Sequence, residues 1–312
     1  MKLPSKINNC LKSNKKVLYR IGNVVYYTFM TVATLFILRY LILFVAFDTF
    51  HTPTRSMTPT IPPDYTGLVN KLKMGGRIFD FMAAAEGRPF SVKRFPGYGK
   101  LERNDIIVFN TPWTNGWDSI AMNMRLYYCK RAIALAGDTL EVRDGHYRVR
   151  GYPHPLGVPA EQDMVKEYVA YKRRTTPDSI PMDGGVYAAP FDSLFNWTID
   201  EMGPLVVPAK GMTITLDNRN LILYRKYIEW ETGEKLPDNL PGTPSDSSAD
   251  TSLPTYTFRE NYCFAAGDHA SDSQDSRYWG FLPEKFIVGT VPMPESLLSR
   301  FFSKLLIKFL RL

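Results

Sequence analysis

A single serine stands out in the stretch DTFHTPTRSMTPT (48–60), where threonine and proline leave no apolar periodicity for a helix. A serine hydroxyl is a poor nucleophile near neutral pH and must lose its proton to a base as it attacks. In a stretch of this composition a serine is ordinarily a turn residue. Ser56 therefore indicates catalysis only if the rest of the chain supplies a base and the groups that support it.

Two kinds of base are available to Ser56. A serine–histidine arrangement would use His51 in the same segment or, beside turns, His146 or His269. A lysine would serve only if burial lowered its pKa towards neutrality. Lys130 is the candidate because it interrupts the apolar run LYYCKRAIALAG, so that it either extends to solvent at a sheet edge or lies in an apolar site.

A third block, GDHASDSQDSRYWGFLP (267–283), is dense in hydroxyls and carboxylates and then changes abruptly to aromatic residues. Alone it fits a solvated polar loop, or a calcium loop that lacks the closing glutamate. It is equally able to supply hydroxyls and an Asp–Arg pair that orient a buried amine. We expect neither a metal site nor a cofactor, because the four histidines are scattered and no CxxC or His/Cys cluster occurs.

The net charge of +7 is concentrated at the two ends of the chain. The first twenty residues carry six basic side chains and no acidic one, and residues 295–312 carry four basic side chains against Glu295. Because these ends hold +6 and +3, more than the total, the sequence between them is mildly acidic. That distribution suits a membrane surface as a partner and argues against nucleic acid.

The apolar stretch IGNVVYYTFMTVATLFILRYLILFVAF (21–47) is long enough to cross a bilayer, whose hydrocarbon core of about 30 Å needs roughly 20 apolar residues. Its one flaw is Arg39, about two turns from the far end, where a long side chain reaches the interface. A cleaved signal peptide would have a shorter apolar run and a small-residue cleavage site. We therefore predict a cytoplasmic basic tail over 1–20, a transmembrane anchor over 21–47, and the rest of the chain outside.

The other end, ESLLSRFFSKLLIKFLRL (295–312), has pairs of apolar residues at helical spacing and basic residues every fourth position on the opposing side. This pattern predicts a basic amphipathic helix lying on a membrane. Packing of the same helix on the globular part is the alternative that the sequence leaves open.

Between the ends, the chain reads as short strands separated by Gly, Pro and Asp, which predicts a mainly β fold. Asp144-Gly145 predicts a hairpin and Asp217–Asn220 predicts the turn of a second hairpin. A short helix is expected near Phe79–Ala85. Cys129 and Cys263 lie outside the anchor and pair only if the fold brings them together. The predicted strands are 65–72, 104–110, 125–135, 138–151, 211–217, 221–233, 255–268 and 286–291.

The predicted architecture is a membrane-anchored antiparallel β domain. Its core is formed by 48–150 and 261–294, and an inserted second β region over 151–260 separates the two parts. Within the insertion, residues 235–254 have almost no apolar content, so we expect a mobile loop there.

Four sequence boxes follow the anchor in a fixed order: SMTPT, RNDIIVFN, KRAIALAGD and GDHASDSQDSRYWGFLP. Together they resemble the boxes of the bacterial type I signal peptidases, the Ser/Lys peptidases of family S26, which remove signal peptides from exported preproteins. The resemblance covers roughly 51–72, 101–140 and 262–292. It implies the fold of that family, preproteins and membrane lipid as partners, and an enzyme of the bacterial inner membrane with a periplasmic catalytic domain.

The resemblance also implies roles for single residues. Ser56 matches the nucleophile and Lys130 the general base. Thr54 matches the position whose hydroxyl joins the Ser56 backbone N–H in the oxyanion hole. Ser273 matches the hydroxyl that hydrogen-bonds the lysine amine.

Further residues are implied in support and substrate binding. Asp275 and Arg277 match the pair that braces the site. Substrate would bind as an added strand with small side chains in shallow apolar pockets, for which Met57 and Tyr128 are our candidates. The sequence departs from the family pattern at three places, namely 63–67, Asn104-Asp105 and His269-Ala270.

Two other functions are compatible with the sequence. One is a related peptidase that cleaves a restricted set of surface proteins. The other is a catalytically inactive, membrane-anchored binding or scaffold protein, against which the joint presence of a serine, a lysine and an Asp–Arg pair argues.

Overall fold

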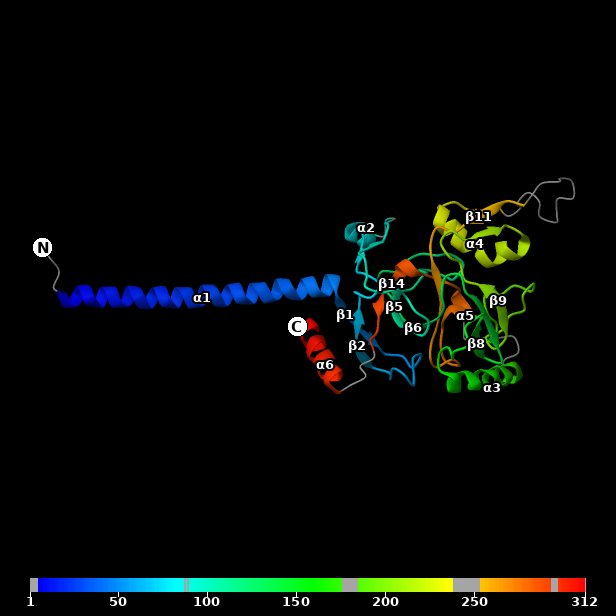
Figure 1. The fold of residues 1–312 in the computed structure, drawn as a ribbon, viewed down its shortest axis with the longest axis horizontal. Helices are drawn as coiled ribbons and strands as arrows, with labels where there is room; N and C mark the ends of the chain where they lie inside the picture. Colours follow the sequence, from blue (N-terminus) through cyan, green and yellow to red (C-terminus); the bar gives the residue numbers. More distant parts are fainter. Residues whose placement is uncertain are drawn as a thin grey trace.

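A long helix, α1 (Ser5–Val45), projects from one end of a β-rich body in the computed structural model (Figure 1). The structure describes residues 5–86, 88, 90–175, 185–237, 253–292 and 297–311. Within these ranges one helical segment, Lys16–Val45, is long and apolar enough to cross a membrane. Residues 21–45 of the predicted anchor thus lie in a helix, which also runs back through most of the predicted basic tail, whereas Phe47 already belongs to the first strand.

The body is built around an antiparallel sheet of seven strands in the order β1-β2-β14-β5-β6-β12-β13. Strands from the two ends of the globular sequence alternate in it, which brings residues near 50, 130 and 265 together. The strands are β1 (Phe47–Thr52), β2 (Tyr65–Asn70), β14 (Ile287–Thr290), β5 (Ile106–Asn110), β6 (Tyr127–Ala134), β12 (Tyr262–Ala266) and β13 (Leu282–Pro283).

Smaller sheets complete the β structure. The predicted hairpin at Asp144-Gly145 is confirmed: Arg143 pairs with His146, and the two turn residues have φ of 51° and 84°, as a tight two-residue turn requires. The small sheets are β8 (His146–Val149)-β7 (Thr139–Arg143)-β9 (Met202–Val206), β10 (Thr213–Thr215)-β11 (Thr255–Thr257) and β3 (Arg77–Ile78)-β4 (Lys93–Arg94).

The prediction of a strand over 221–233 is wrong, because this stretch lies in helix α4 (Asn218–Thr232). The second predicted hairpin, at Asp217–Asn220, is therefore also wrong. Asp217 is the N-cap of that helix, since its side chain accepts a hydrogen bond from Asn220 N at 2.7 Å. Gly233 ends the helix in the left-handed conformation. Aromatic and β-branched residues suggested a strand, but their buried members recur at helical spacing, at Leu221, Tyr224, Tyr227 and Ile228.

Helices also lie elsewhere in the body. The predicted region 151–260 contains α3 and α4 beside its strands, so it is not purely β. The short helix expected near Phe79–Ala85 is present as α2. Most of the expected loop over 235–254 lies outside the described residues. The remaining bounds are α2 (Phe81–Ala85), α3 (Pro159–Thr175), α5 (Ser276–Trp279), the 3₁₀ helix η2 (Glu284–Phe286) and α6 (Leu297–Arg311).

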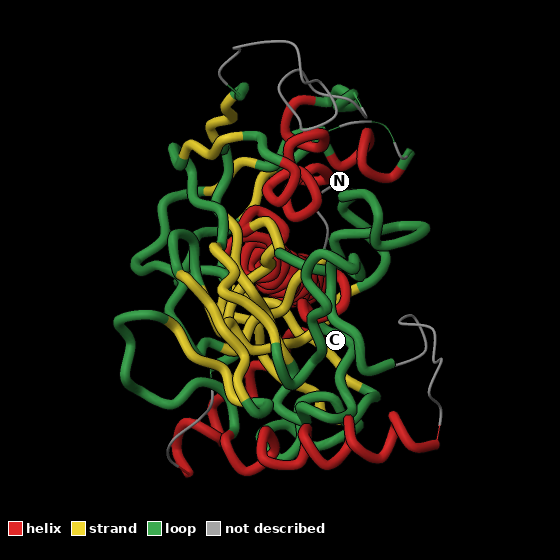
Figure 2. Tube along the Cα trace, turned by 90° about the vertical axis from the view of Figure 1, so that its right-hand side faces the viewer, coloured by secondary structure: helices red, strands yellow, loops and turns green. Residues whose placement is uncertain are grey.

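The central sheet is covered on both faces. In β5, Ile107 and Phe109 join the larger hydrophobic core, whereas Ile106 and Val108 join a smaller one that contains Met57. Because successive side chains of a strand point to opposite faces, a strand buried on both sides reads as a continuous apolar run. Figure 2 looks along α1, which appears end-on behind the strands of the body.

Candidate active site

The structure brings Ser56 and Lys130 together, although 74 positions separate them in the sequence. The Lys130 amine lies 2.6 Å from Ser56 Oγ. Lys130 is placed by β6, where it pairs with Ile107 of β5. The lysine side chain is buried, with 3% of the residue exposed, so it does not extend to solvent at the sheet edge.

The environment of Lys130 favours the neutral amine. Burial, the largest effect, lowers the pKa of Lys130 to about 8, against the opposing attraction of the Asp275 carboxylate. A lysine with its ordinary pKa of 10.5 would be almost entirely protonated at neutral pH. This amine is therefore able to accept a proton from the serine beside it.

The segment that carries Ser56 is fixed by its neighbours. Met57 and Ile61 are fully buried in the smaller core, and Ile61 N donates to Met57 O at 2.8 Å. The hydroxyl of Thr58 donates to Arg55 O at 2.8 Å, which closes a turn around the serine. The apolar side chains hold the turn, while Ser56 itself stays partly exposed.

Thr54 stands next to the pair. Its Oγ1 lies 3.3 Å from Ser56 Oγ, so the two hydroxyls are within hydrogen-bond reach of each other. Thr54 is exposed to solvent. Thr54 therefore offers a solvent-exposed hydroxyl, able to donate a hydrogen bond, next to Ser56 Oγ.

Asp275 and Arg277, in the segment that follows β12, form a fully buried ion pair. The carboxylate accepts from Arg277 Nη2 at 2.8 Å and Nε at 2.9 Å, and from Gly267 N at 3.0 Å. Burial alone would raise the pKa of Asp275, but the Arg277 guanidinium holds it below its usual value. The pair ties the two ends of the loop 267–277 together and caps α5.

Ser273 differs from the implied arrangement. Its Oγ is buried without a hydrogen-bond partner in the structure, so the bond to the Lys130 amine that the resemblance implies is not made. The amine is directed at Ser56 instead. A Cβ at Gly267 would lie 2.2 Å from Ser273 Oγ and 2.4 Å from Ser56 O, so this close packing requires glycine.

The loop reaches the serine segment through His269, one of the departures from the family pattern. His269 N donates to the Ser56 carbonyl at 3.2 Å, and its Nδ1 lies 3.2 Å from Thr58 Oγ1. Ala270, which belongs to the same departure, accepts a hydrogen bond from Arg277 Nη2 at its carbonyl, at 2.6 Å. The backbone thus supplies contacts that hold the loop at these two positions.

A second ion pair was missed by the sequence reasoning. Arg131 binds Asp268 through two nitrogens, each at 2.6 Å, and also donates to Thr60 Oγ1 at 3.2 Å. It therefore links β6, the loop after β12 and the segment that follows Ser56. The available signal was the charged residue beside Lys130 in a strand that is otherwise apolar.

The two substrate candidates are placed differently. Tyr128 flanks the site: the Lys130 amine lies 5.6 Å from the centre of its ring, and its hydroxyl lies 3.4 Å from Gln274 Oε1. Met57 is fully buried in the core beneath the serine. Their contact with substrate stays a prediction.

No histidine ring is among the hydrogen-bond partners of Ser56 Oγ in the part of the chain that the structure describes. His51 lies near Thr66, and His146 pairs with Asp163 in another sheet region. Two carboxylates of the polar loop, Asp268 and Asp275, are paired with arginines, which favours a brace over a calcium loop. Cys129 and Cys263 are both free thiols.

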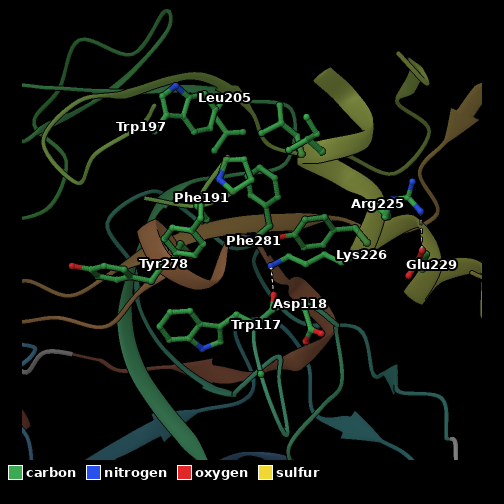
Figure 3. Close-up of a pocket in the computed structure, with 18 of the residues that line it drawn as sticks. Trp117, Asp118, Phe191, Trp197, Leu205, Arg225, Lys226, Glu229, Tyr278 and Phe281 are labelled. Atoms are coloured by element: carbon green, nitrogen blue, oxygen red, sulfur yellow. Dashed lines mark hydrogen bonds and ion pairs between the residues drawn. The ribbon is translucent and has the colours of Figure 1, made fainter. Parts of the chain in front are cut away.

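A cavity of about 1040 Å³ lies next to α5, and its lining includes neither Ser56 nor Lys130 (Figure 3). Lys226 of α4 extends into it and donates to Trp117 O at 2.7 Å and to Trp279 O at 2.9 Å. Burial lowers the pKa of Lys226 to about 8. Lys130 and Lys226 thus both have lowered pKa values, but of these two described lysines Lys130 alone is hydrogen-bonded to a serine hydroxyl.

Comparison with known proteins identifies a matching family and similar sequences. The family described as signal peptidase, peptidase S26, matches residues 24–295. Signal peptidase I of Buchnera aphidicola subsp. Baizongia pistaciae is 26% identical over 297 residues, which cover 93% of this chain and 82% of that protein. Signal peptidase I of Buchnera aphidicola subsp. Acyrthosiphon pisum is 23% identical over 252 residues, covering 78% and 66%.

A solved structure is also similar in sequence. Signal peptidase I from Enterococcus faecalis is 22% identical, and the match covers 62% of this chain and 97% of that one with a TM-score of 0.26.

Proposed function

Because this chain belongs to the signal peptidase family, peptidase S26, we propose that it is a membrane-bound serine endopeptidase that removes N-terminal signal peptides from exported preproteins. Ser56 is the nucleophile and Lys130 the general base. The observation that carries these assignments is the 2.6 Å contact between the buried Lys130 amine and Ser56 Oγ. A mainly antiparallel β body behind one long apolar helix is consistent with them.

The contact supports a two-step hydrolysis. As Ser56 Oγ attacks the scissile carbonyl carbon, the neutral Lys130 amine takes the hydroxyl proton and becomes an ammonium. The ammonium then gives this proton to the departing amine, which leaves as the new N-terminus of the mature protein. Lys130 next deprotonates a water that attacks the acyl-serine ester, and the signal peptide leaves with its new carboxylate while Ser56 regains its proton.

The negative charge that develops on the carbonyl oxygen needs donors. We assign this task to the Ser56 backbone N–H and the Thr54 hydroxyl, whose Oγ1 lies 3.3 Å from Ser56 Oγ. A donor of this kind contributes about 10²–10³ in rate in other acyl-transfer enzymes. We assign a supporting role to three residues of the segment that follows β12, namely Ser273, Asp275 and Arg277. The buried Asp275–Arg277 ion pair fixes this segment, which donates a hydrogen bond to the serine carbonyl.

The pairing of β6 leaves room for an extended substrate. β12 pairs with β6 only over Arg131–Ala134, whereas β5 pairs along Tyr127–Arg131. Among the described residues, the first half of β6 therefore has a strand on one side only. A signal peptide bound there as an added strand would pass Tyr128 and present its scissile bond to the Ser56–Lys130 pair.

Membrane lipid is the second partner. A single pass of α1, with the basic tail in the cytoplasm and the catalytic body on the outer face of the bacterial inner membrane, follows from the charge asymmetry around the helix. The body is close to the bilayer, because α1 ends at Val45 and β1 begins at Phe47. We assign the enzyme no metal and no nucleic-acid partner.

The test is cleavage of a preprotein with an Ala-X-Ala site by the detergent-solubilised chain and its Ser56→Ala and Lys130→Ala variants. We expect cleavage by the parent chain and background rates for both variants. Lys226→Met is the matched control, because Lys226 is also buried with a pKa near 8 but contacts no serine. Full activity of Lys130→Ala would contradict the proposed base, and an inactive parent chain would favour the inactive scaffold.

A further inference from the structure

Arg39, the one charged residue in the apolar stretch 21–47, is bound by main-chain carbonyls at the end of α6. Its Nη2 donates to Leu310 O at 2.9 Å and its Nε to Phe309 O at 3.3 Å. The last carbonyls of a helix have no partner within the helix and carry partial negative charge. The guanidinium therefore supplies both the donors and the charge that this helix end needs.

The outer side of α6 combines apolar and basic side chains. Phe301 is 61% exposed and Leu305 54% exposed, while Leu310 at the contact with the anchor is 3% exposed. Lys304 and Lys308 are exposed next to Phe301 and Leu305 along the same helix. A helix of this kind lies with its apolar side at the acyl boundary and its cations among anionic headgroups.

The position of Arg39 along α1 agrees with a location of α6 at the boundary between the acyl chains and the headgroups. Arg20 and Arg39 are nineteen residues apart, which spans about 28 Å at 1.5 Å per residue and matches a hydrocarbon core of about 30 Å. With these two cations at the two boundaries, the carbonyl end of α6, which Arg39 binds, lies at the outer boundary. Figure 1 shows α6 beside this end of α1, inclined across its axis.

The end of α1 is also locked to the sheet. Lys71 donates to Leu43 O at 2.6 Å and pairs with Asp48 at 2.9 Å, and its own N–H donates to Ala46 O at 2.8 Å. A cation at the carbonyl end of a helix is stabilising for the same reason as at α6. The anchor, the β1–β2 edge and α6 thus meet in one set of contacts.

We propose that α6 binds the anionic phospholipid surface and docks its carbonyl end on Arg39, so that α1 and α6 together set the height of the body above the bilayer. Arg39 is a positioning residue in this arrangement. The C-terminal helix then packs on both protein and lipid: its carbonyl end contacts the anchor and its exposed side contacts lipid. It concerns the membrane contact and holds whether or not the chain cleaves signal peptides.

The lipid contact is tested with an environment-sensitive fluorophore on Leu305→Cys in the full chain, with Cys10 and the partly exposed free thiol Cys129 replaced by serine. The matched control carries the label on Glu167→Cys, an exposed position of α3. In vesicles containing phosphatidylglycerol we expect blue-shifted emission and quenching by shallow spin-labelled lipids at 305, and neither at 167. Quenching at 305 should fall severalfold in pure phosphatidylcholine or in Lys304→Gln/Lys308→Gln. Equal emission at 305 and 167 would overturn the lipid contact.

The docking on Arg39 is tested with the same label. Arg39→Gln should reduce quenching at 305 severalfold, Arg39→Lys should give an intermediate value, and Arg20→Gln, at the other end of the span, should leave it unchanged. Unchanged quenching in Arg39→Gln, or equal losses in Arg39→Gln and Arg20→Gln, would overturn the docking. If Arg39→Gln fails to fold, Arg39→Lys decides, because quenching equal to the parent contradicts a guanidinium bound by two carbonyls. The readout does not depend on peptidase activity, so it fails separately from the proposed function.

Discussion

The pKa of Lys130 sets a definite pH dependence for the reaction. With a pKa of about 8, about one amine in eleven is neutral at pH 7, whereas an ordinary lysine with a pKa of 10.5 would have about one in three thousand. Burial therefore increases the reactive fraction by roughly 300-fold at that pH. We expect kcat/KM to rise about tenfold per pH unit below about 8 and to level off above it.

The assay is cleavage of one peptide substrate at pH values from 6 to 10, at constant ionic strength. His269→Gln is the informative control, because His269 contacts the serine segment directly. Its ring lies next to the Thr58 hydroxyl, and its backbone N–H donates to the Ser56 carbonyl. The profile of this variant should keep its limb near pH 8. A limb near the ordinary imidazole pKa of about 6.5 that disappears in the control would refute the lysine base.

The same shift predicts that the site costs stability. Because the folded pKa of Lys130 lies below its unfolded value, the unfolded chain binds more protons between about 8 and 10.5, and the free energy of unfolding rises with pH across that window. At pH 7 the cost of the buried charge is at most about 3 kcal/mol. Lys130→Met should thus be inactive yet more stable than the parent chain in urea unfolding at pH 7. A large loss of stability in this variant would contradict the view that burying the Lys130 amine is unfavourable.

Two further substitutions test the loop that supports the site. Asp275→Asn should lower the free energy of unfolding by about 3–5 kcal/mol in urea titrations, because it leaves the Arg277 charge buried without its partner. In the parent chain, the stability that the ionised Asp275 contributes is fully present above the unfolded pKa of this carboxyl. It is lost as the pH falls through the lowered pKa of the folded state. Gly267→Ala should abolish cleavage, because its Cβ would lie 2.2 Å from Ser273 Oγ, whereas Gly99→Ala, with no neighbour closer than 3.4 Å, should behave as the parent. Wild-type cleavage by Gly267→Ala would show that the loop adjusts without cost to the serine.

Local signals allowed part of the fold to be predicted. The hairpin at Asp144-Gly145 depends on two adjacent turn residues that tolerate positive φ, so its signal is contained in a short local stretch of sequence. The helix α4 was missed although both of its caps, Asp217 and Gly233, were readable, because its aromatic and β-branched residues favoured a strand. Composition outweighed the capping pattern in that case.

Long-range packing explains what the sequence did not reveal in the site. The burial of Lys130 depends on the sheet being covered on both faces, which alternation within one strand does not indicate. The Arg131–Asp268 pair joins residues 137 positions apart and has no local signature. The free hydroxyl of Ser273 depends on how tightly the loop packs on Gly267.

Direct titration of the Lys130 side chain tests the central mechanism most closely. Carbon-labelled lysine in the solubilised chain gives an NMR signal for each amine, and Lys130→Arg and Lys226→Met assign the two buried ones. We predict that the Lys130 signal titrates with a midpoint near pH 8 and that this midpoint moves in Ser56→Ala, where the hydroxyl at 2.6 Å is gone. A midpoint near 10.5, unaffected by the loss of that hydroxyl, would mean that the amine is an ordinary solvated ammonium and does not activate the serine.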